Sequence, residues 1–141
     1  MVNLILISHG TFAEGLLNAT ELIIGEQKNV KTFALNEGDS IEQLELDVED
    51  AIKELSQDAE VLVLVDLFGA SPCNVSVRLV QRYPGVKIVT GMNLPMMIEV
   101  AMNREHMSAA ELVEYAAETG QKHCKSLEGW LAGFEDDPFE A

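Results

Sequence analysis

Near its N-terminus the chain runs Ile5-Leu6-Ile7-Ser8-His9-Gly10-Thr11, and this stretch predicts the fold. Residues 4–8 are apolar toward both sides, which is typical of a parallel strand that helices cover on both faces. A second run of this kind, residues 61–65, is followed directly by Asp66. We expect the carboxyl ends of these two strands to meet in space and His9 to be the reactive group there.

Two further strands alternate with helices along the chain. They are expected at residues 30–35 and 86–90, and Lys31 and Thr32 place the former nearer a sheet edge. Strands alternating with helices at this spacing, joined by right-handed crossovers, predict an α/β fold. The expected architecture is a doubly wound, mainly parallel sheet, of strand order 2-1-3-4, with helices on both faces.

The helix boundaries are predicted from capping signals. In a capping box, a Ser or Thr and a Glu or Gln three residues later satisfy free main-chain N–H groups. The expected boxes are Thr11/Glu14, Ser40/Gln43 and Ser108/Glu111. Ser71 is the expected N-cap of another helix, with Pro72 at its first position. The helices are therefore expected at residues 12–24, 40–55, 71–83, 94–102 and 108–120.

Composition excludes several classes of protein. The 141 residues indicate one domain, and 24 acidic against 9 basic residues give a net charge of −15. This charge argues against nucleic-acid binding and suits a basic protein partner. Cys73 and Cys124 show no zinc or disulfide spacing, and we expect neither metal nor cofactor. Residues 1–3 lack the basic start of a signal peptide, so we expect none here, and no apolar run approaches the roughly 20 residues of a membrane span. A cytoplasmic location is therefore expected.

Two strand ends supply the residues with the clearest chemistry. In a sheet of order 2-1-3-4 the chain order reverses between strands one and three, where ligands bind in such folds. A neutral His9 ring offers a nucleophilic nitrogen, and a hydrogen bond to Asp66 would fix its tautomer. The plainer alternatives are a histidine that only caps its strand and an aspartate that only caps a helix or turn.

A candidate anion site lies beside them in the sequence. Gly69-Ala70-Ser71-Pro72 leads into a helix N-terminus, where main-chain N–H groups attract phosphate, and the Ser71 hydroxyl could add a further donor. Together with His9 and Asp66 this predicts a phosphohistidine site. A competing hypothesis makes Cys73 a thiol nucleophile, although a cysteine packed under the helix start is commoner. His106 and His123 are expected on the surface.

Three separated segments resemble one known family. They are Ile7-Ser8-His9-Gly10, then 65–74 (Val-Asp-Leu-Phe-Gly-Ala-Ser-Pro-Cys-Asn), then 91–96 (Gly-Met-Asn-Leu-Pro-Met). The chain is similar over residues 1–125 to the IIA domains of the mannose class of the bacterial phosphoenolpyruvate-dependent sugar phosphotransferase system, and residues 126–141 form an acidic tail. The resemblance implies a phosphotransferase component in which HPr phosphorylates His9.

The resemblance also implies the other partners and site residues. His9 would pass the phosphoryl group to a IIB component, for sugar uptake through IIC and IID membrane components with which the protein associates peripherally. Asp66 would orient His9. The residues facing the phosphate would be Gly10, Phe68, Gly69, Ala70 and Ser71, with Asn93 as a further candidate in the third segment.

The chain departs from the family pattern in two places, and the family has one further property that bears on this chain. Ala70 stands where relatives usually carry a second glycine, so its methyl group narrows the cradle. Because the chain ends at Ala141, IIB is expected as a separate polypeptide. The family forms homodimers that exchange a C-terminal strand, which would correspond to residues 122–127 here.

Two other functions fit the same residues. One is the phosphotransfer subunit of dihydroxyacetone kinase, although the 69–74 segment is less similar to that family. The other is a flavodoxin-like module that binds a small anion without covalent chemistry. The transported sugar cannot be predicted from this chain, because the membrane components select it.

Overall fold

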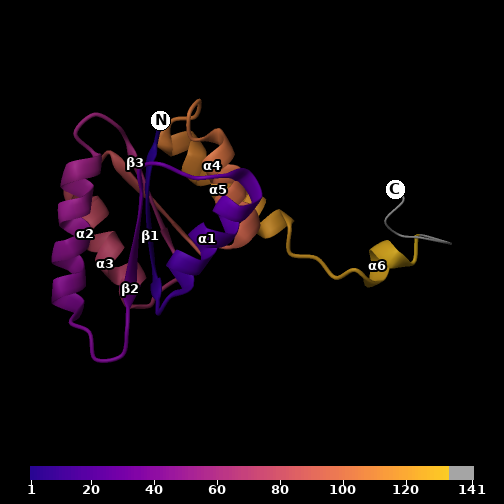
Figure 1. The fold of residues 1–141 in the computed structure, drawn as a ribbon, viewed down its shortest axis with the longest axis horizontal. Coiled ribbons are helices and arrows are strands. Elements are labelled where there is room, and N and C mark those ends of the chain that lie inside the picture. Colours follow the sequence, from indigo (N-terminus) through magenta and orange to yellow (C-terminus); the bar gives the residue numbers. More distant parts are fainter. Residues whose placement is uncertain (134–141) are drawn as a thin grey trace.

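A computed structural model describes residues 1–133 and contains one four-stranded parallel sheet (Figure 1). The strand order is β2-β1-β3-β4, and all three pairings are parallel. The strands are β1 (Asn3–His9), β2 (Val30–Leu35), β3 (Val61–Val65) and β4 (Val86–Thr90). This order confirms the prediction from the sequence, including the edge position of the second strand.

Helices cover both faces of the sheet, as expected (Figure 1). On one face lie α2 (Ile41–Leu55) and α3 (Ser71–Arg82), and on the other α1 (Phe12–Ile24), α4 (Leu94–Asn103) and α5 (Ala109–Lys122). A short helix, α6 (Glu128–Leu131), stands apart from this body. Within residues 1–133 no helix has the length and apolar character needed to cross a membrane.

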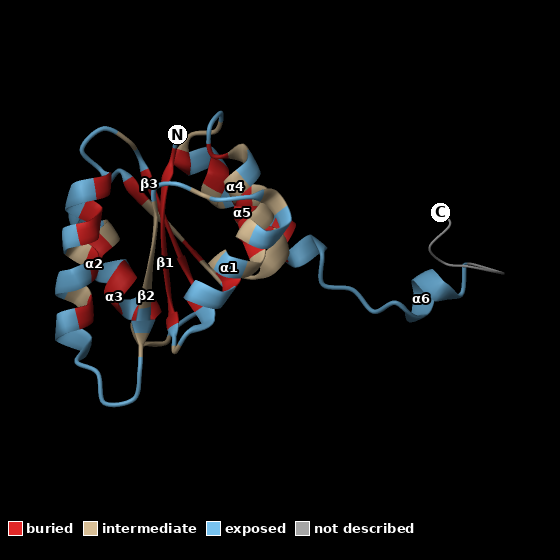
Figure 2. Ribbon diagram, viewed as in Figure 1, coloured by how far each residue is buried: buried red, intermediate tan, exposed pale blue. Residues whose placement is uncertain are grey.

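Alternate residues of β1 belong to two separate cores. Leu4 and Leu6 pack with α1, α4 and α5, whereas Ile5 and Ile7 pack with α2 and α3. Figure 2 shows the buried strands β1 and β3 in red, between helices whose outer faces are exposed. Because side chains alternate between the two faces of a strand, a sheet covered on both sides requires apolar residues throughout. This requirement explains the uninterrupted apolar run from which the fold was predicted.

Two expected caps at the helix starts are wrong. Thr11 precedes α1 but its side chain makes no capping hydrogen bond, and the Ser8 hydroxyl instead accepts from the Ala13 N–H at 2.7 Å. The N-cap of α3 is Ala70, which has no side chain to donate or accept, and Ser71 is already helical. The local spacing could not show this, because Ser8 reaches the helix only across a folded turn.

The other two caps agree with the sequence to different degrees. Ser108 and Glu111 form the complete capping box of α5. The Ser40 side chain accepts from the Gln43 N–H, but the Gln43 side chain donates to Asp47 one turn later instead of returning to Ser40. A side chain four residues away on the same helix face is an equally accessible partner.

The last large helix continues beyond the expected stop at Gly120 to Lys122. Gly120 is buried against α4, and a Cβ atom there would lie 2.7 Å from Met96 Cε. Gly120 therefore packs inside α5 against Asn93 and Met96 of the neighbouring segment, instead of ending the helix. Residues 123–127 then leave the body without forming a strand in the single chain (Figure 1), and the rest of the predicted acidic tail, 134–141, lies outside the described residues.

Candidate functional site

His9 and Asp66 are hydrogen bonded at the carboxyl end of the sheet. Ile7 of β1 is paired with Val65 of β3, so the residues that follow each strand lie at the same edge. The Oδ2 atom of Asp66 lies 2.8 Å from Nδ1 of His9 and 2.8 Å from its main-chain nitrogen. The expected meeting of the two strand ends is therefore present in the structure.

The ionisation state of Asp66 decides which nitrogen of His9 carries the proton. Burial raises the pKa of Asp66 because it disfavours the charged carboxylate. The hydrogen bonds and the charge of His9 lower the pKa by more, so the pKa of Asp66 lies below its usual value. At neutral pH Asp66 is therefore an acceptor only, and the Nδ1 atom of His9 must donate. Nε2 is then unprotonated in the neutral ring, and the His9 side chain is half exposed to solvent.

The second carboxylate oxygen of Asp66 has an unusual environment. Oδ1 is buried and has no hydrogen-bond partner among residues 1–133. An unpaired buried acceptor costs on the order of 1–3 kcal/mol, and such atoms are uncommon outside functional sites. The two side-chain hydrogen bonds of this carboxylate within residues 1–133 therefore both go from His9 to Oδ2.

The turn after His9 is tightly constrained. Gly10 has a φ of +54°, in the left-handed region that favours glycine, and its N–H donates to the Leu35 carbonyl of β2 at 2.9 Å. The Ser8 hydroxyl binds both the Gly10 carbonyl and the Ala13 N–H. Ser8 was not among the sequence candidates, and its apolar neighbours gave no signal that its side chain would hold this turn.

The predicted anion cradle also begins at this edge. After Asp66, the chain passes through Gly69, whose φ is +82°, and enters α3 at Ser71. The Ser71 hydroxyl and main-chain N–H have no hydrogen-bond partner in the described chain, so both remain available as donors. The N-terminus of α3 and the nearby start of α1 each carry a partial positive charge.

No basic side chain occurs in the segments that surround His9. Residues 10–12, 36–39, 66–71 and 91–93 contain no lysine or arginine. Exposed apolar side chains stand there instead: Phe12, Leu67 and Phe68, of which Phe68 is 81% exposed. The edge therefore combines one free imidazole nitrogen with helix N-termini and an apolar rim.

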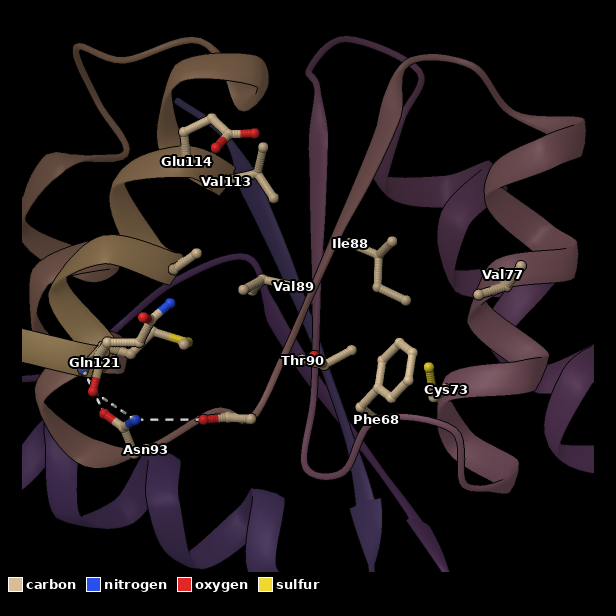
Figure 3. A pocket seen from close by; sticks show the side chains of 14 residues that line it. Phe68, Cys73, Val77, Ile88, Val89, Thr90, Asn93, Val113, Glu114 and Gln121 are labelled. Atoms are coloured by element: carbon tan, nitrogen blue, oxygen red, sulfur yellow. Dashed lines mark hydrogen bonds between the residues drawn. The ribbon is translucent and has the colours of Figure 1, made fainter. Parts of the chain in front are cut away.

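A groove of about 520 Å³ runs along the outer side of β4, between α3 and α5 (Figure 3). Its β4 side chains are Ile88, Val89 and Thr90, and Phe68 reaches it from the loop after β3. Neither His9 nor Asp66 lines this groove. The groove is therefore distinct from the His9 edge and is linked to it through Phe68.

Asn93 lies at the same end of the sheet but its side chain is already engaged. Oδ1 accepts from the Met96 N–H and caps α4, and Nδ2 donates to the carbonyls of Gly91 and Gly120 (Figure 3). These bonds join the loop after β4 to the end of α5. In this arrangement the Asn93 amide is an organiser of the loop, and a phosphate contact from it stays a prediction.

The remaining sequence candidates are separate from the His9 edge. The Cys73 thiol is buried in the first turn of α3, as the packing alternative expected. His106 and His123 are exposed, as predicted. Among residues 1–133 no cluster of three side chains could hold a metal ion.

Comparison with known proteins identifies relatives of the whole body. A family profile described as "PTS system fructose IIA component" matches residues 3–117. The fructose-specific EIIA component of Bacillus subtilis is 31% identical over 80% of this chain and 77% of that protein. The mannose-specific EIIAB component of Escherichia coli K12 is 36% identical over 85% of this chain, which spans only 38% of that protein.

Solved structures give the same result. The mannose/sorbose-specific IIA subunit of the phosphotransferase system from Enterococcus faecalis superimposes with a TM-score of 0.83. It is 32% identical, and the match covers 90% of this chain and 95% of that one. The likeness therefore extends over sequence and fold together.

Proposed function

Since this chain belongs to the mannose-type EIIA family of the sugar phosphotransferase system, we propose that His9 carries a phosphoryl group between two proteins. The donor is the phosphocarrier HPr and the acceptor is a IIB component. The observation that carries this proposal is the double contact of Asp66 Oδ2 with His9, since it directs a lone pair of Nε2 outward. We assign this role to a domain of residues 1–125, as expected from the sequence.

The transfer uses Nε2 as the nucleophile. As the Nε2–P bond forms, the bond between phosphorus and the donor breaks, and the donor keeps that electron pair. Nδ1 retains its proton, so the phosphorylated ring is cationic and stays paired with the Asp66 carboxylate. In the second step the acceptor attacks phosphorus and the Nε2–P bond breaks. Nε2 keeps the electron pair of that bond, so the His9 ring leaves in its neutral form.

The phosphoryl oxygens need positive charge around them. We assign their binding to Gly10, Phe68, Gly69, Ala70 and Ser71, which follow His9 or Asp66 in the chain and lead into α1 or α3, where main-chain N–H groups can bind anions. Because the surrounding segments lack lysine and arginine, further compensation must come from the docked partner. The net charge of −15 is complementary to a basic protein surface of this kind.

Protein partners fit the exposed rim around His9. Phe12, Leu67 and Phe68, from the segments that follow His9 and Asp66, expose apolar side chains, and the imidazole is half exposed. Such a surface suits alternate docking of HPr and of a IIB component, the latter beside IIC and IID at the cytoplasmic side of the membrane. The sugar is selected by those membrane components.

A homodimer is the assembly that the free edge of β4 supports. In the described chain β4 is hydrogen bonded on one side only, and the apolar groove runs along its other side (Figure 3). Residues 122–127, the end of α5 and the segment after it, are exposed in the single chain, so the corresponding segment of a second copy can add to this edge. Sedimentation equilibrium should give the mass of two chains, and the mass of one chain would contradict the exchange.

Labelling tests the central proposal. The protein is incubated with ³²P-phosphoenolpyruvate, enzyme I and HPr, and acid-labile, alkali-stable phosphate is measured on the N-terminal peptide. We expect one phosphate per chain in wild type and in His106→Ala, and none in His9→Ala. Labelling of His9→Ala, or an unlabelled wild type that is merely stabilised by free phosphate, would contradict a covalent carrier and favour an anion-binding module.

A further inference from the structure

We propose that the Ser8 hydroxyl is a positioning group that aligns His9 for transfer, a role that rests on the proposed function. Ser8 is the last buried residue of β1 and is fully inaccessible to solvent. It lies directly before a half-exposed histidine, at the point where the chain turns from the sheet into α1. Its side chain is the one polar group inside this turn.

Ser8 joins the two ends of the turn. Its Oγ atom accepts from the Ala13 N–H at 2.7 Å and lies 3.3 Å from the Gly10 carbonyl, to which it donates. The first bond fixes the start of α1 to the end of β1. The second holds the Gly10–Thr11 peptide, one residue beyond His9, and Gly10 itself has a left-handed conformation.

Two other bonds hold the outer side of the same turn. The His9 N–H donates to Asp66 Oδ2, and the Gly10 N–H donates to the Leu35 carbonyl. Ser8 therefore holds the turn from its buried side, and β2 and the end of β3 hold it through Leu35 and Asp66. The position of the His9 main chain depends on all of these hydrogen bonds.

The imidazole itself has little other support. Its one hydrogen bond is from Nδ1 to the same oxygen that accepts from its main-chain nitrogen. Asp66 Oδ2 can stay 2.8 Å from both the main-chain nitrogen and Nδ1 of His9 only while the His9 ring keeps one orientation relative to its main chain. Loss of the inner support lets the turn relax, because Gly10 has wide conformational freedom and Thr11 provides no alternative cap.

Ser76 provides a control that separates an effect on the orientation of His9 from a general loss of stability. Ser76 is also buried, and its hydroxyl donates to the Pro72 carbonyl within α3. Ser8→Ala and Ser76→Ala therefore remove the same atom from similarly buried sites. Both should lower the melting temperature, but only Ser8→Ala should change the environment of His9.

The experiment measures His9 before and during transfer. ¹⁵N NMR of the unphosphorylated protein should show a single Nδ1–H tautomer in wild type and Ser76→Ala, and a mixture of tautomers in Ser8→Ala. The initial rate of phosphorylation by phospho-HPr, taken well below each melting temperature, should fall about 10–100-fold in Ser8→Ala alone. An unchanged tautomer or a rate within 3-fold of wild type would overturn the inference.

A second pair covers the case in which Ser8→Ala does not fold. Ser8→Thr keeps the hydroxyl and Ser8→Val has the same shape without it, so the pair differs only in the hydrogen bonds. Thr should resemble wild type in tautomer and rate, and Val should not; equal behaviour of the two would overturn the inference. An unlabelled wild type would refute the proposed function instead, since the tautomer measurement requires no phosphate.

Discussion

Asp66 Oδ2 accepts two hydrogen bonds from His9, one from the main-chain nitrogen and one from the ring, each 2.8 Å long. The two residues are 57 positions apart and meet because their strands are parallel neighbours. One oxygen therefore fixes both the end of β1 and the orientation of the imidazole. Its companion, Oδ1, is buried without a partner in the described chain.

Asp66→Asn should abolish most of the phosphotransfer while the fold persists. The amide keeps the shape of the side chain but loses the charge that stabilises a cationic ring, and it accepts through one end only. We expect the initial rate of labelling from HPr to fall by roughly 10²-fold or more. Asp47→Asn, an exposed change on α2, is the control and should leave the rate unchanged. A rate for Asp66→Asn within 3-fold of wild type would contradict the orienting role.

The contribution of Asp66 to stability should decline in acid. Its pKa is below the ordinary value of 3.8 because His9 bonding exceeds the burial penalty. A carboxyl group with a lowered pKa binds protons more readily when the protein unfolds. Its stabilisation is therefore complete above about pH 4 and is lost as pH falls through the folded-state pKa.

Urea unfolding of wild type and Asp66→Asn at pH 6 and pH 3 measures this effect. From pH 6 to pH 3 the unfolding free energy of wild type should fall more than that of Asp66→Asn. Comparing the two proteins cancels the titration of the other acids, including Glu45 and Glu111, whose pKa values are lowered too. A difference that is independent of pH would show that the Asp66 pKa is not lowered.

Gly10→Ala should destabilise the protein through its main chain alone. A Cβ atom at Gly10 would meet nothing within 4 Å, but the φ of +54° is strained for alanine, at a cost of about 1–2 kcal/mol. Gly15→Ala is the control, because that site in α1 has equally open space and a helical main chain. It should be stabilising by about 0.5–1 kcal/mol. Equal effects in urea unfolding would exclude main-chain strain at Gly10.

Arg104→Ala should destabilise the fold without affecting the site chemistry. The guanidinium is buried and donates to the Lys28 carbonyl at 2.6 Å and to the Val2 carbonyl at 3.5 Å, at the opposite end of β1 from His9. Leaving these buried acceptors unpaired costs about 1–3 kcal/mol. Arg78→Ala breaks an exposed pair with Glu45 and should destabilise the protein less than Arg104→Ala does, because solvent screens the exposed pair.

The two Arg variants should then be compared in phosphotransfer. Well below their melting temperatures, both should accept label at rates near that of wild type, because neither guanidinium lies near His9. A loss of the phosphotransfer rate in Arg104→Ala but not in Arg78→Ala would contradict this expectation. It would show that a change at the amino end of the sheet affects His9 at the carboxyl end.

The strands and their order could be predicted because burial on both faces leaves a direct record in the sequence. The run at residues 4–8 and the run at residues 61–65 each supply alternate side chains to two cores. The meeting of His9 with Asp66 then follows from parallel pairing alone. No side-chain detail was needed for either result.

Side-chain partners across folded turns could not be predicted. Thr11 has the local spacing of an N-cap, yet Ser8 caps the first turn of α1 from inside the sheet. Gly120 has the local character of a helix stop, yet it serves as a contact between α4 and α5. In both cases the deciding neighbour is close in space and outside the window that local rules examine.

The sequence by itself determined the sheet, its strand order and the residues that gather at its carboxyl edge, because hydrophobic periodicity and chain connectivity allow few other arrangements. Only the tertiary structure decided how those residues are held. It showed that one oxygen of Asp66 accepts from both the main-chain nitrogen and Nδ1 of His9, that Ser8 supports the turn from within, and that the Asn93 amide is already bonded. Hydrogen bonds depend on ångström distances between segments far apart in the chain, and residue order alone does not specify those distances.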